Sequence, residues 1–392
     1  MPTPVPLPIQ TVYAELVEQA WLAAADRDFA GNGAFVAKTV KGRRYWYWQA
    51  ADPAAPGGRS QKYVGPETPD LLARIAHHRQ VRTEDRQRHS MVAALRAASL
   101  TAPDALTGRV LIALEAAGVF RLRAVVIGTV AYQVYGALLG ERLGLAATRT
   151  GDLDLAQFVD VSGAVGDRID APDFEAVLRR ADPRFRRLPG LPGQTHAEAR
   201  SAYYGIGREY RVEVLTPNRD PDTDGAPVPL PALGADGHPL RYLDFLIHRE
   251  VQAVALHGAG VPINVPAPER FALHKLIVAR RRDDQAKARK DLAQAAQLLD
   301  VLARQRPFEL AAAWHEAWSR GPGWREPLAQ AHALLPGEAQ VALAAALDAD
   351  RRAAHATSHV TLTPLVNEAT VVTGPERGAD GAGHTPDDVP DP

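Results

Sequence analysis

Cysteine is absent from the 392 residues, which excludes disulfides, thiol nucleophiles and cysteine-ligated zinc. No apolar run approaches the roughly 18 residues of a membrane-spanning helix. The start, MPTPVPLPIQ, lacks the basic and apolar regions of a secretory signal, so we expect a cytoplasmic protein with no membrane partner. The formal net charge is only −1, so any contact with nucleic acid must come from a local basic patch.

The chain has ample material for a core, since 46% of its residues are hydrophobic and 23% are charged. Its composition, rich in proline, glycine, alanine and arginine, is typical of a GC-rich bacterial genome. We predict three structured parts at residues 1–102, 103–220 and 221–352, followed by a disordered, polar tail at 353–392.

The first part predicts a helix at 11–29, a small antiparallel sheet from the period-2 stretch AFVAKTVKGRRYWYWQ, and a basic helix at 69–99. Basic residues interleaved with aromatic ones suit a nucleic-acid surface, because bases stack and phosphates form ion pairs. The alternative is a sheet whose aromatic residues pack on neighbouring helices. The residues concerned are Lys38, Lys41, Arg43, Arg44, Tyr45, Trp46, Tyr47, Trp48, Lys62, Tyr63 and, on the helix, Arg74, Arg79, Arg82, Arg86, Arg88 and Arg96.

The second part alternates helices and strands, which predicts an α+β fold with helices packed on a sheet. We expect Asp104 to cap a helix that ends at Gly118, and Asp170 to cap the helix APDFEAVLRRAD. The remaining segments are a strand RAVVIG, a helix TVAYQVYGALLG, a strand TGDLDLAQF and a strand YRVEVLTP.

Asp152 and Asp154 lie two residues apart on a predicted strand, so their side chains share one face. Two such carboxylates repel each other unless a positive group lies between them, and a divalent metal serves that purpose. The alternative is a solvated face at a sheet edge.

Two further features give the pair a context. Upstream, a buried strand ends at Gly128-Thr129 and a helix opens, a turn that lets phosphate approach backbone N–H groups. Downstream, the strand YRVEVLTP offers Glu213 as a third acid, and three converging acids can hold two metal ions. The alternatives are a plain tight turn and a solvent-facing Glu213.

The third part becomes helical after PINVPAPER. It carries eight Lys or Arg residues between Arg270 and Lys290, against Asp283 and Asp284 only. Lys275 lies beside the apolar stripe of its helix and could reach a cleft, while Lys290-Asp291 is expected to open the next helix. A basic face opposite the carboxylates suits a triphosphate, although a solvated helix face is the alternative. His274 is interpreted as a packing or hydrogen-bonding residue.

The order GT…AYxxY…TGDLDL…VEVLTP…PAPERFALHKL…KARKDLAQA resembles the bacterial nucleotidyltransferase-fold family of the DNA polymerase β superfamily, related to AbiEii-type abortive-infection toxins, over about residues 105–305. The resemblance implies a polymerase-β-type core, a small mixed sheet with helices, followed by a helical domain. It implies that Gly128 and Thr129 contact phosphate and that Asp152, Asp154 and Glu213 bind metal. It also implies that Lys275, Lys290 and Asp291 serve the nucleotide. The third acid of this superfamily is usually Asp, and Glu213 departs from that pattern.

The leading hypothesis is an enzyme that transfers a nucleoside monophosphate from an NTP to an acceptor hydroxyl, requires Mg²⁺ or Mn²⁺, and releases pyrophosphate. The acceptor is an RNA end, a protein side chain or a small molecule. The alternative is a catalytically weak binding module that uses the same fold to hold RNA or a partner protein. A role as a toxin follows from the family analogy alone, and no oligomeric state is predicted.

Overall fold

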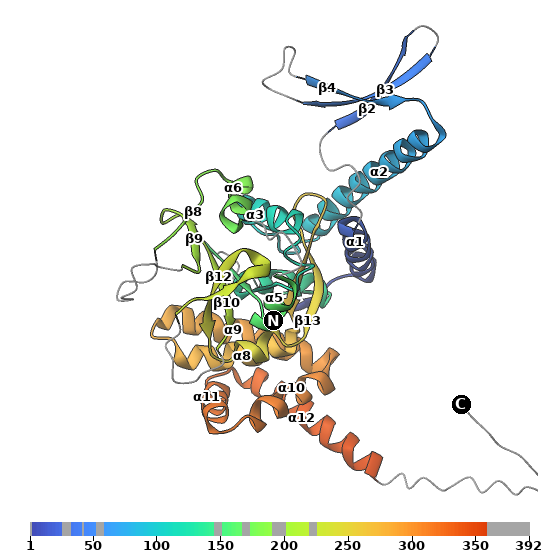
Figure 1. Cartoon of the computed structure of the whole chain (residues 1–392). Coiled ribbons are helices and arrows are strands. Elements are labelled where there is room, and N and C mark those ends of the chain that lie inside the picture. Colours follow the sequence, from blue (N-terminus) through green and yellow to red (C-terminus); the bar gives the residue numbers. More distant parts are fainter. Residues whose placement is uncertain are drawn as a thin grey trace, which may run out of the picture. The chain divides into compact units, whose positions relative to one another are not determined.

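The computed structural model describes residues 2–25, 33–40, 43–51, 59–144, 151–166, 173–189, 201–218 and 226–358 (Figure 1). The chain divides into two compact units, Met1–Arg351 and Arg352–Pro392. The boundaries expected near residues 102 and 220 fall inside the first unit, and the division of residues 1–352 into three parts stays a prediction. The fold is a mixed α+β fold, as expected.

The N-terminal segment contains the predicted helix, small sheet and basic helix. Helix α1 begins four residues earlier than expected, because Pro8 is tolerated in a first turn where its missing N–H has no helical partner. The three strands form an antiparallel sheet in the order β2-β3-β4. The elements are α1 (Leu7–Ala25), β2 (Gly33–Val40), β3 (Arg43–Ala51), β4 (Arg59–Pro66) and α2 (Pro69–Ala97).

A larger mixed sheet lies within the first unit. Its strands run in the order β11-β12-β10-β7-β5, and β9 pairs with β10 and with β8. Strands β10 and β7 are parallel, and β5 is antiparallel to β7. The strands are β5 (Val125–Ile127), β7 (Asp152–Ala156), β8 (Arg186–Arg187), β9 (Tyr203–Ile206), β10 (Tyr210–Pro217), β11 (Val228–Leu230) and β12 (Ala235–Leu240).

Helix α3 precedes these strands in the sequence, and α4, α5 and α6 lie between them. The Asp104 carboxylate accepts hydrogen bonds from the N–H groups of Leu106 and Thr107, which confirms the predicted cap of α3. The cap predicted at Asp170 is wrong, because α6 begins after Asp173, whose side chain accepts from the Glu175 N–H directly before the apolar run. Asp170 itself lies outside the described residues. The helices are α3 (Ala105–Ala116), α4 (Gly128–Leu138), α5 (Val159–Gly166) and α6 (Phe174–Ala181).

The remainder of the first unit is a hairpin and a group of helices. Helix α9 begins at Gln285 after an Asp284 cap, so the expectation that Lys290-Asp291 would open it is wrong, and both lie in its second turn. The elements are α7 (Leu243–Ile247), β13 (Glu250–Ala255), β14 (Val261–Pro266), α8 (Pro268–Arg281), α9 (Gln285–Gln305), α10 (Pro307–Ser319), α11 (Pro322–Ala333) and α12 (Gly337–Ser358). Short additional elements are β1 (Thr3–Pro4), which pairs with β6 (Glu141–Arg142), and the 3₁₀ turn η2 (Pro231–Leu233).

Helix α12 continues to Ser358, so residues 353–358 of the expected disordered tail are helical. Alanine, the best helix former, is frequent there. The other tail residues lie outside the described part of the chain. Among the described residues, none of the helices combines the length and apolar character that crossing a membrane requires.

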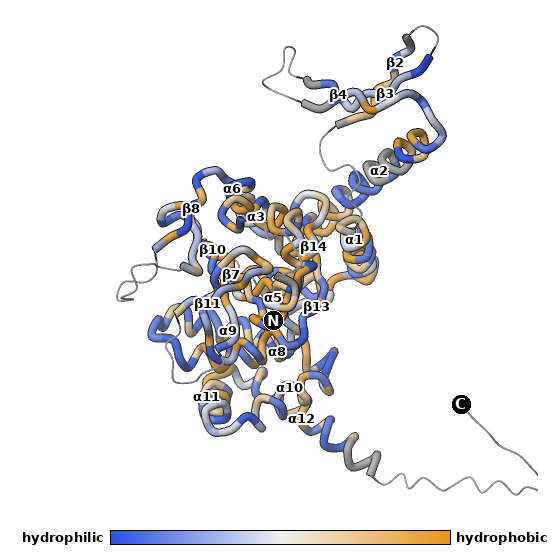
Figure 2. The backbone as a smooth tube through the Cα atoms, viewed as in Figure 1, coloured by the Kyte–Doolittle hydropathy of each residue, from blue (hydrophilic) through white to orange (hydrophobic). Residues whose placement is uncertain are grey.

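One hydrophobic core joins the central sheet to the C-terminal helices. It includes fully buried side chains from β7, β10, α8 and α9, such as Leu153, Val212, Phe271 and Leu298. Figure 2 shows hydrophobic segments in orange around β7, α3 and β14. Burying one such side chain contributes roughly 1.5–3 kcal/mol. This shared core fixes the helices α8 and α9 against the sheet and thereby positions the residues described next.

Candidate active site

The turn between β5 and α4 is shaped around Asp154. Gly128 has φ +66°, in the left-handed region, and a Cβ built there would lie 2.2 Å from Asp154 Oδ2. Ile127 pairs with Asp154 across the antiparallel strands. Glycine is therefore required at this position for two reasons: the left-handed backbone conformation and the close approach of the Asp154 carboxylate.

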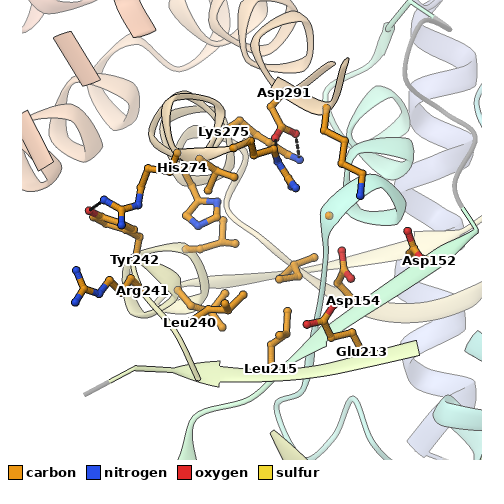
Figure 3. A pocket seen from close by; sticks show the side chains of 18 of the residues that line it. Asp152, Asp154, Glu213, Leu215, Leu240, Arg241, Tyr242, His274, Lys275 and Asp291 are labelled. Atoms are coloured by element: carbon orange, nitrogen blue, oxygen red, sulfur yellow. Dashed lines mark hydrogen bonds and ion pairs between the residues drawn. The ribbon is translucent and has the colours of Figure 1, made fainter. Parts of the chain in front are cut away.

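The carboxylates are presented by two adjacent parallel strands. Asp154 on β7 is the register partner of Glu213 on β10, and Asp152 is the partner of Arg211. Leu153 lies between the two aspartates in sequence and is fully buried on the opposite face, as strand alternation predicts. Figure 3 shows the Asp154 and Glu213 carboxylates together at the cavity, with Asp152 set apart from them.

The two neighbouring acids carry poorly compensated negative charge. Burial, and then repulsion from Asp152, raises the pKa of Asp154 to about 6. Burial, and then repulsion from Asp154, raises the pKa of Glu213 to about 7, against a hydrogen bond from the Tyr203 hydroxyl that lowers it. A cation between these groups would relieve the repulsion that raises both pKa values.

Helices α8 and α9 place cations across the cavity from these acids. Lys275 Nζ donates to Asp291 Oδ1 at 2.6 Å, and Arg282 Nε donates to Asp291 Oδ2 at 2.6 Å. Lys275 and Asp291 are both buried. Because each of its oxygens already accepts from a cation, Asp291 positions the two basic side chains.

Lys290 links the basic helices to the glycine turn. Its Nζ donates to Thr129 Oγ1 at 3.0 Å, over a separation of 161 residues. Burial, and then repulsion from Lys275, lowers the pKa of Lys290. A basic side chain from a distant part of the chain therefore reaches the turn.

These groups line one cavity of about 920 Å³. The eight residues expected from the sequence all contribute to its wall: Gly128, Thr129, Asp152, Asp154, Glu213, Lys275, Lys290 and Asp291. His274 also lines it, and burial followed by repulsion from Lys275 lowers its pKa to about 3, so the ring is neutral near pH 7. Apolar side chains at another part of the wall include Leu240, Leu243, Leu246 and Val278.

Sequence reasoning missed three residues of this site. Arg282 belonged to the basic run from Arg270 to Lys290, for which a triphosphate-facing surface and a solvated face were both open, and it holds Asp291. The Tyr203 side chain, on the neighbouring strand β9, hydrogen-bonds Glu213. The turn residues between β9 and β10 were the sequence feature that could have predicted this hairpin. Tyr242 lines the cavity with φ +67°, a strained conformation for a non-glycine residue, and the sequence carries no signal for it.

A metal ion could use the carboxylate oxygens of this wall. Within the described ranges, no three His, Asp or Glu side chains lie close enough together to hold a metal ion by themselves. Mg²⁺ is commonly held by one or two carboxylates with water and substrate phosphates completing the shell. The Asp154–Glu213 pair fits that mode of binding.

Comparison with known proteins gives one match. A family model described as "Nucleotidyltransferase" matches residues 105–319, more than half of the chain. No curated protein and no solved structure matches the chain. The matched range contains both acidic strands, the glycine turn and both basic helices. The chain belongs to this nucleotidyltransferase family.

Proposed function

We propose that the protein transfers a nucleoside monophosphate from an NTP to an acceptor hydroxyl, within a polymerase-β-type core. The observation that carries the proposal is the in-register pair Asp154 and Glu213 beside the Gly128 turn, facing the cations of α8 and α9. Phosphoryl transfer requires carboxylates that bind a metal and basic side chains that bind a triphosphate, and here they lie on opposite walls of one cavity.

The metal would be Mg²⁺ or Mn²⁺, held by Asp154 and Glu213, with water and substrate phosphates completing the shell. The carboxylate oxygens suit these hard cations. The raised pKa values of Asp154 and Glu213 support the same assignment. When bound, such an ion neutralises phosphate charge and lowers the pKa of the acceptor hydroxyl.

The triphosphate would lie between the turn and the basic helices. Thr129 and the first N–H groups of α4 hold a phosphate, as helix N-termini do. Lys275, Arg282 and Lys290 stabilise the charge that develops on the departing pyrophosphate. The acceptor hydroxyl gives its proton to solvent water as its oxygen bonds to the α-phosphorus. The bond from that phosphorus to the bridging oxygen breaks at the same time, and pyrophosphate leaves with the electron pair. His274 takes no part in the proton transfer, because its low pKa makes it a poor base.

The apolar part of the cavity suits the nucleoside. Tyr242 is held there by a T-shaped contact with Trp324 at 4.7 Å and by the Arg281 guanidinium at 5.4 Å from its ring. Its hydroxyl donates to Gly323 O at 3.1 Å. Because the ring is fixed, it offers a rigid apolar surface beside the sugar and base.

The order of motifs further supports a kinship with AbiEii-type toxins, and with it a bacterial origin and a cytoplasmic role in defence. The acceptor in this proposal is an RNA end, a protein side chain or a small molecule.

The test is incubation of the protein with each α-labelled NTP, Mg²⁺, and total cellular RNA and protein. Asp154→Asn keeps the shape of the side chain and removes its charge, and label transfer is expected to fall at least about 100-fold, as when transition-state charge stabilisation is lost. Asp283→Asn is the matched control, because Asp283 is exposed and lies outside the cavity wall. Equal label transfer by Asp154→Asn and the unchanged protein would contradict the assignment of this site to nucleotidyl transfer.

A binding module is the second candidate. It is favoured by the lack of a three-ligand metal cluster among the described residues and by the longer Glu213 at the third acidic position. Titration of an NTP with and without Mg²⁺ distinguishes the two: metal-independent binding without pyrophosphate release is expected for the module.

A further inference from the structure

The small sheet β2-β3-β4 has two different faces. Phe35, Trp46, Leu71 and Ile75 form a separate hydrophobic cluster, so one face packs on the start of α2. Trp48 lies against the same cluster. For these two tryptophans, the interpretation that the aromatic residues pack on a helix is confirmed.

The opposite face carries a cluster of tyrosines. Cross-strand register pairs Tyr47 with Tyr63 and Lys38 with Tyr45. The Tyr63 ring lies 5.5 Å from that of Tyr47 and 6.3 Å from that of Tyr45, measured between centroids. Tyr63, on the edge strand β4, is 53% exposed, so its ring is open to solvent.

Positive charge surrounds this cluster. Lys38 Nζ, on β2, lies 4.9 Å from the centroid of the Tyr47 ring, and Arg43 is exposed at the start of β3. The segment 33–66 contains six Lys or Arg residues and one acid, Asp52. Lys41 and Asp52 lie outside the described residues, as do the side chains of Arg59 and Lys62.

The helix α2 contributes less charge than expected. Arg88 is buried and pairs with Asp85 at 3.0 Å, so it is not part of an exposed basic surface. The side chains of Arg79 and Arg82 lie outside the described residues. The candidate surface is therefore the sheet face itself, which we call the tyrosine face: Lys38, Arg43, Tyr45, Tyr47 and Tyr63.

We propose that the tyrosine face binds single-stranded RNA. An exposed ring such as Tyr63 stacks with a base, and a polymer of phosphates complements the basic segment. Lysine, present here as Lys38 beside the Tyr47 ring, is depleted at protein interfaces. A base stacks on Tyr63, and neighbouring phosphates pair with Lys38 and Arg43. A tyrosine hydroxyl is able to hydrogen-bond the 2′-hydroxyl that separates RNA from DNA. The proposal does not depend on nucleotidyl transfer.

The test is fluorescence anisotropy of the full chain with a labelled, unstructured RNA of about twelve nucleotides, a length that covers one such platform. Tyr63→Ala is expected to weaken binding ~10-fold, the loss typical of one stacked base. Tyr63→Trp retains a ring and is expected to bind as the unchanged protein does. Phe308→Ala is the matched control, because Phe308 is 52% exposed on α10.

Two further measurements vary the charge of the tyrosine face and the kind of nucleic acid offered to it. Lys38→Gln is expected to reduce the slope of log affinity against log salt by about 0.7, the value for one phosphate contact to a single strand. Unchanged affinity in both Tyr63→Ala and Lys38→Gln would overturn the proposal. Equal affinity for a duplex RNA or for DNA of the same sequence would overturn the assignment to single-stranded RNA. Asp154→Asn is expected to bind RNA normally, so loss of catalysis and loss of this surface are distinguishable.

Discussion

Replacing Gly128 with alanine tests the architecture of the proposed site. The residue has φ +66°, and an alanine there costs roughly 1–2 kcal/mol for the left-handed backbone alone. The new Cβ would also lie 2.2 Å from Asp154 Oδ2, so the carboxylate must move. Overpacking of this kind adds about 1–3 kcal/mol, which brings the expected loss in the free energy of unfolding to roughly 2–5 kcal/mol.

Gly207 supplies a matched control for this substitution. It has φ +53°, and nothing lies within 4 Å of a Cβ built on it. Urea unfolding of Gly207→Ala is therefore expected to show the backbone cost of about 1–2 kcal/mol only. Label transfer is expected to fall in Gly128→Ala, because Asp154 is displaced, and to stay unchanged in Gly207→Ala.

A double-mutant cycle isolates the contact between the turn and the acid. In an Asp154→Ala background the carboxylate is absent, so the cost of Gly128→Ala is expected to shrink to the value for Gly207→Ala. Equal free energies of unfolding and equal label transfer in Gly128→Ala and Gly207→Ala would contradict the close approach of Gly128 to Asp154.

Two further predictions concern charge. Asp291→Ala leaves Lys275 buried without its carboxylate, so the free energy of unfolding is expected to fall by about 3 kcal/mol in urea titration. Asp348→Ala removes an exposed partner of Arg351 and is expected to change the free energy of unfolding little. Equal effects of the two substitutions would contradict the role given to Asp291. The pKa values of Asp154 and Glu213 rise from near 4 in the unfolded chain to about 6 and 7 in the folded protein. Protonation of these carboxyls therefore stabilises the fold at low pH, and this contribution to the free energy of unfolding is lost as pH rises through about 6 and 7. Mg²⁺ is therefore expected to raise Tm more at pH 8 than at pH 5.5, and a Tm increase independent of pH would argue against binding at these carboxylates.

Local sequence patterns predicted the strands and helices that carry the site. The alternation in DLDL and VEVL predicted β7 and β10 with their acids on one face, and Asp104 marked the start of α3. These signals are local, because strand alternation and helix capping depend on residues a few positions apart. The errors at Asp170 and at Lys290-Asp291 concern only where a helix begins, which neighbouring acids left ambiguous.

Contacts over long separations could not be read from the sequence. The Asp154–Glu213 register is set by strand pairing across 59 residues, and Lys290 reaches Thr129 only because α9 shares a core with the sheet. The basic run that contains Arg282 was compatible with a solvated face as well as with a triphosphate-facing one, and the contact of Arg282 with Asp291 depends on how α8 packs on α9. Tertiary packing determined each of these contacts.

Nucleotidyl transfer by this protein is tested most simply by pyrophosphate release from each NTP, with RNA and protein acceptors and Mg²⁺ present. We expect Mg²⁺-dependent release by the unchanged protein, at least about 100-fold less release by Asp154→Asn, and full release by Asp283→Asn. Equal release by Asp154→Asn and the unchanged protein, or no release with any NTP, would contradict nucleotidyl transfer at this site.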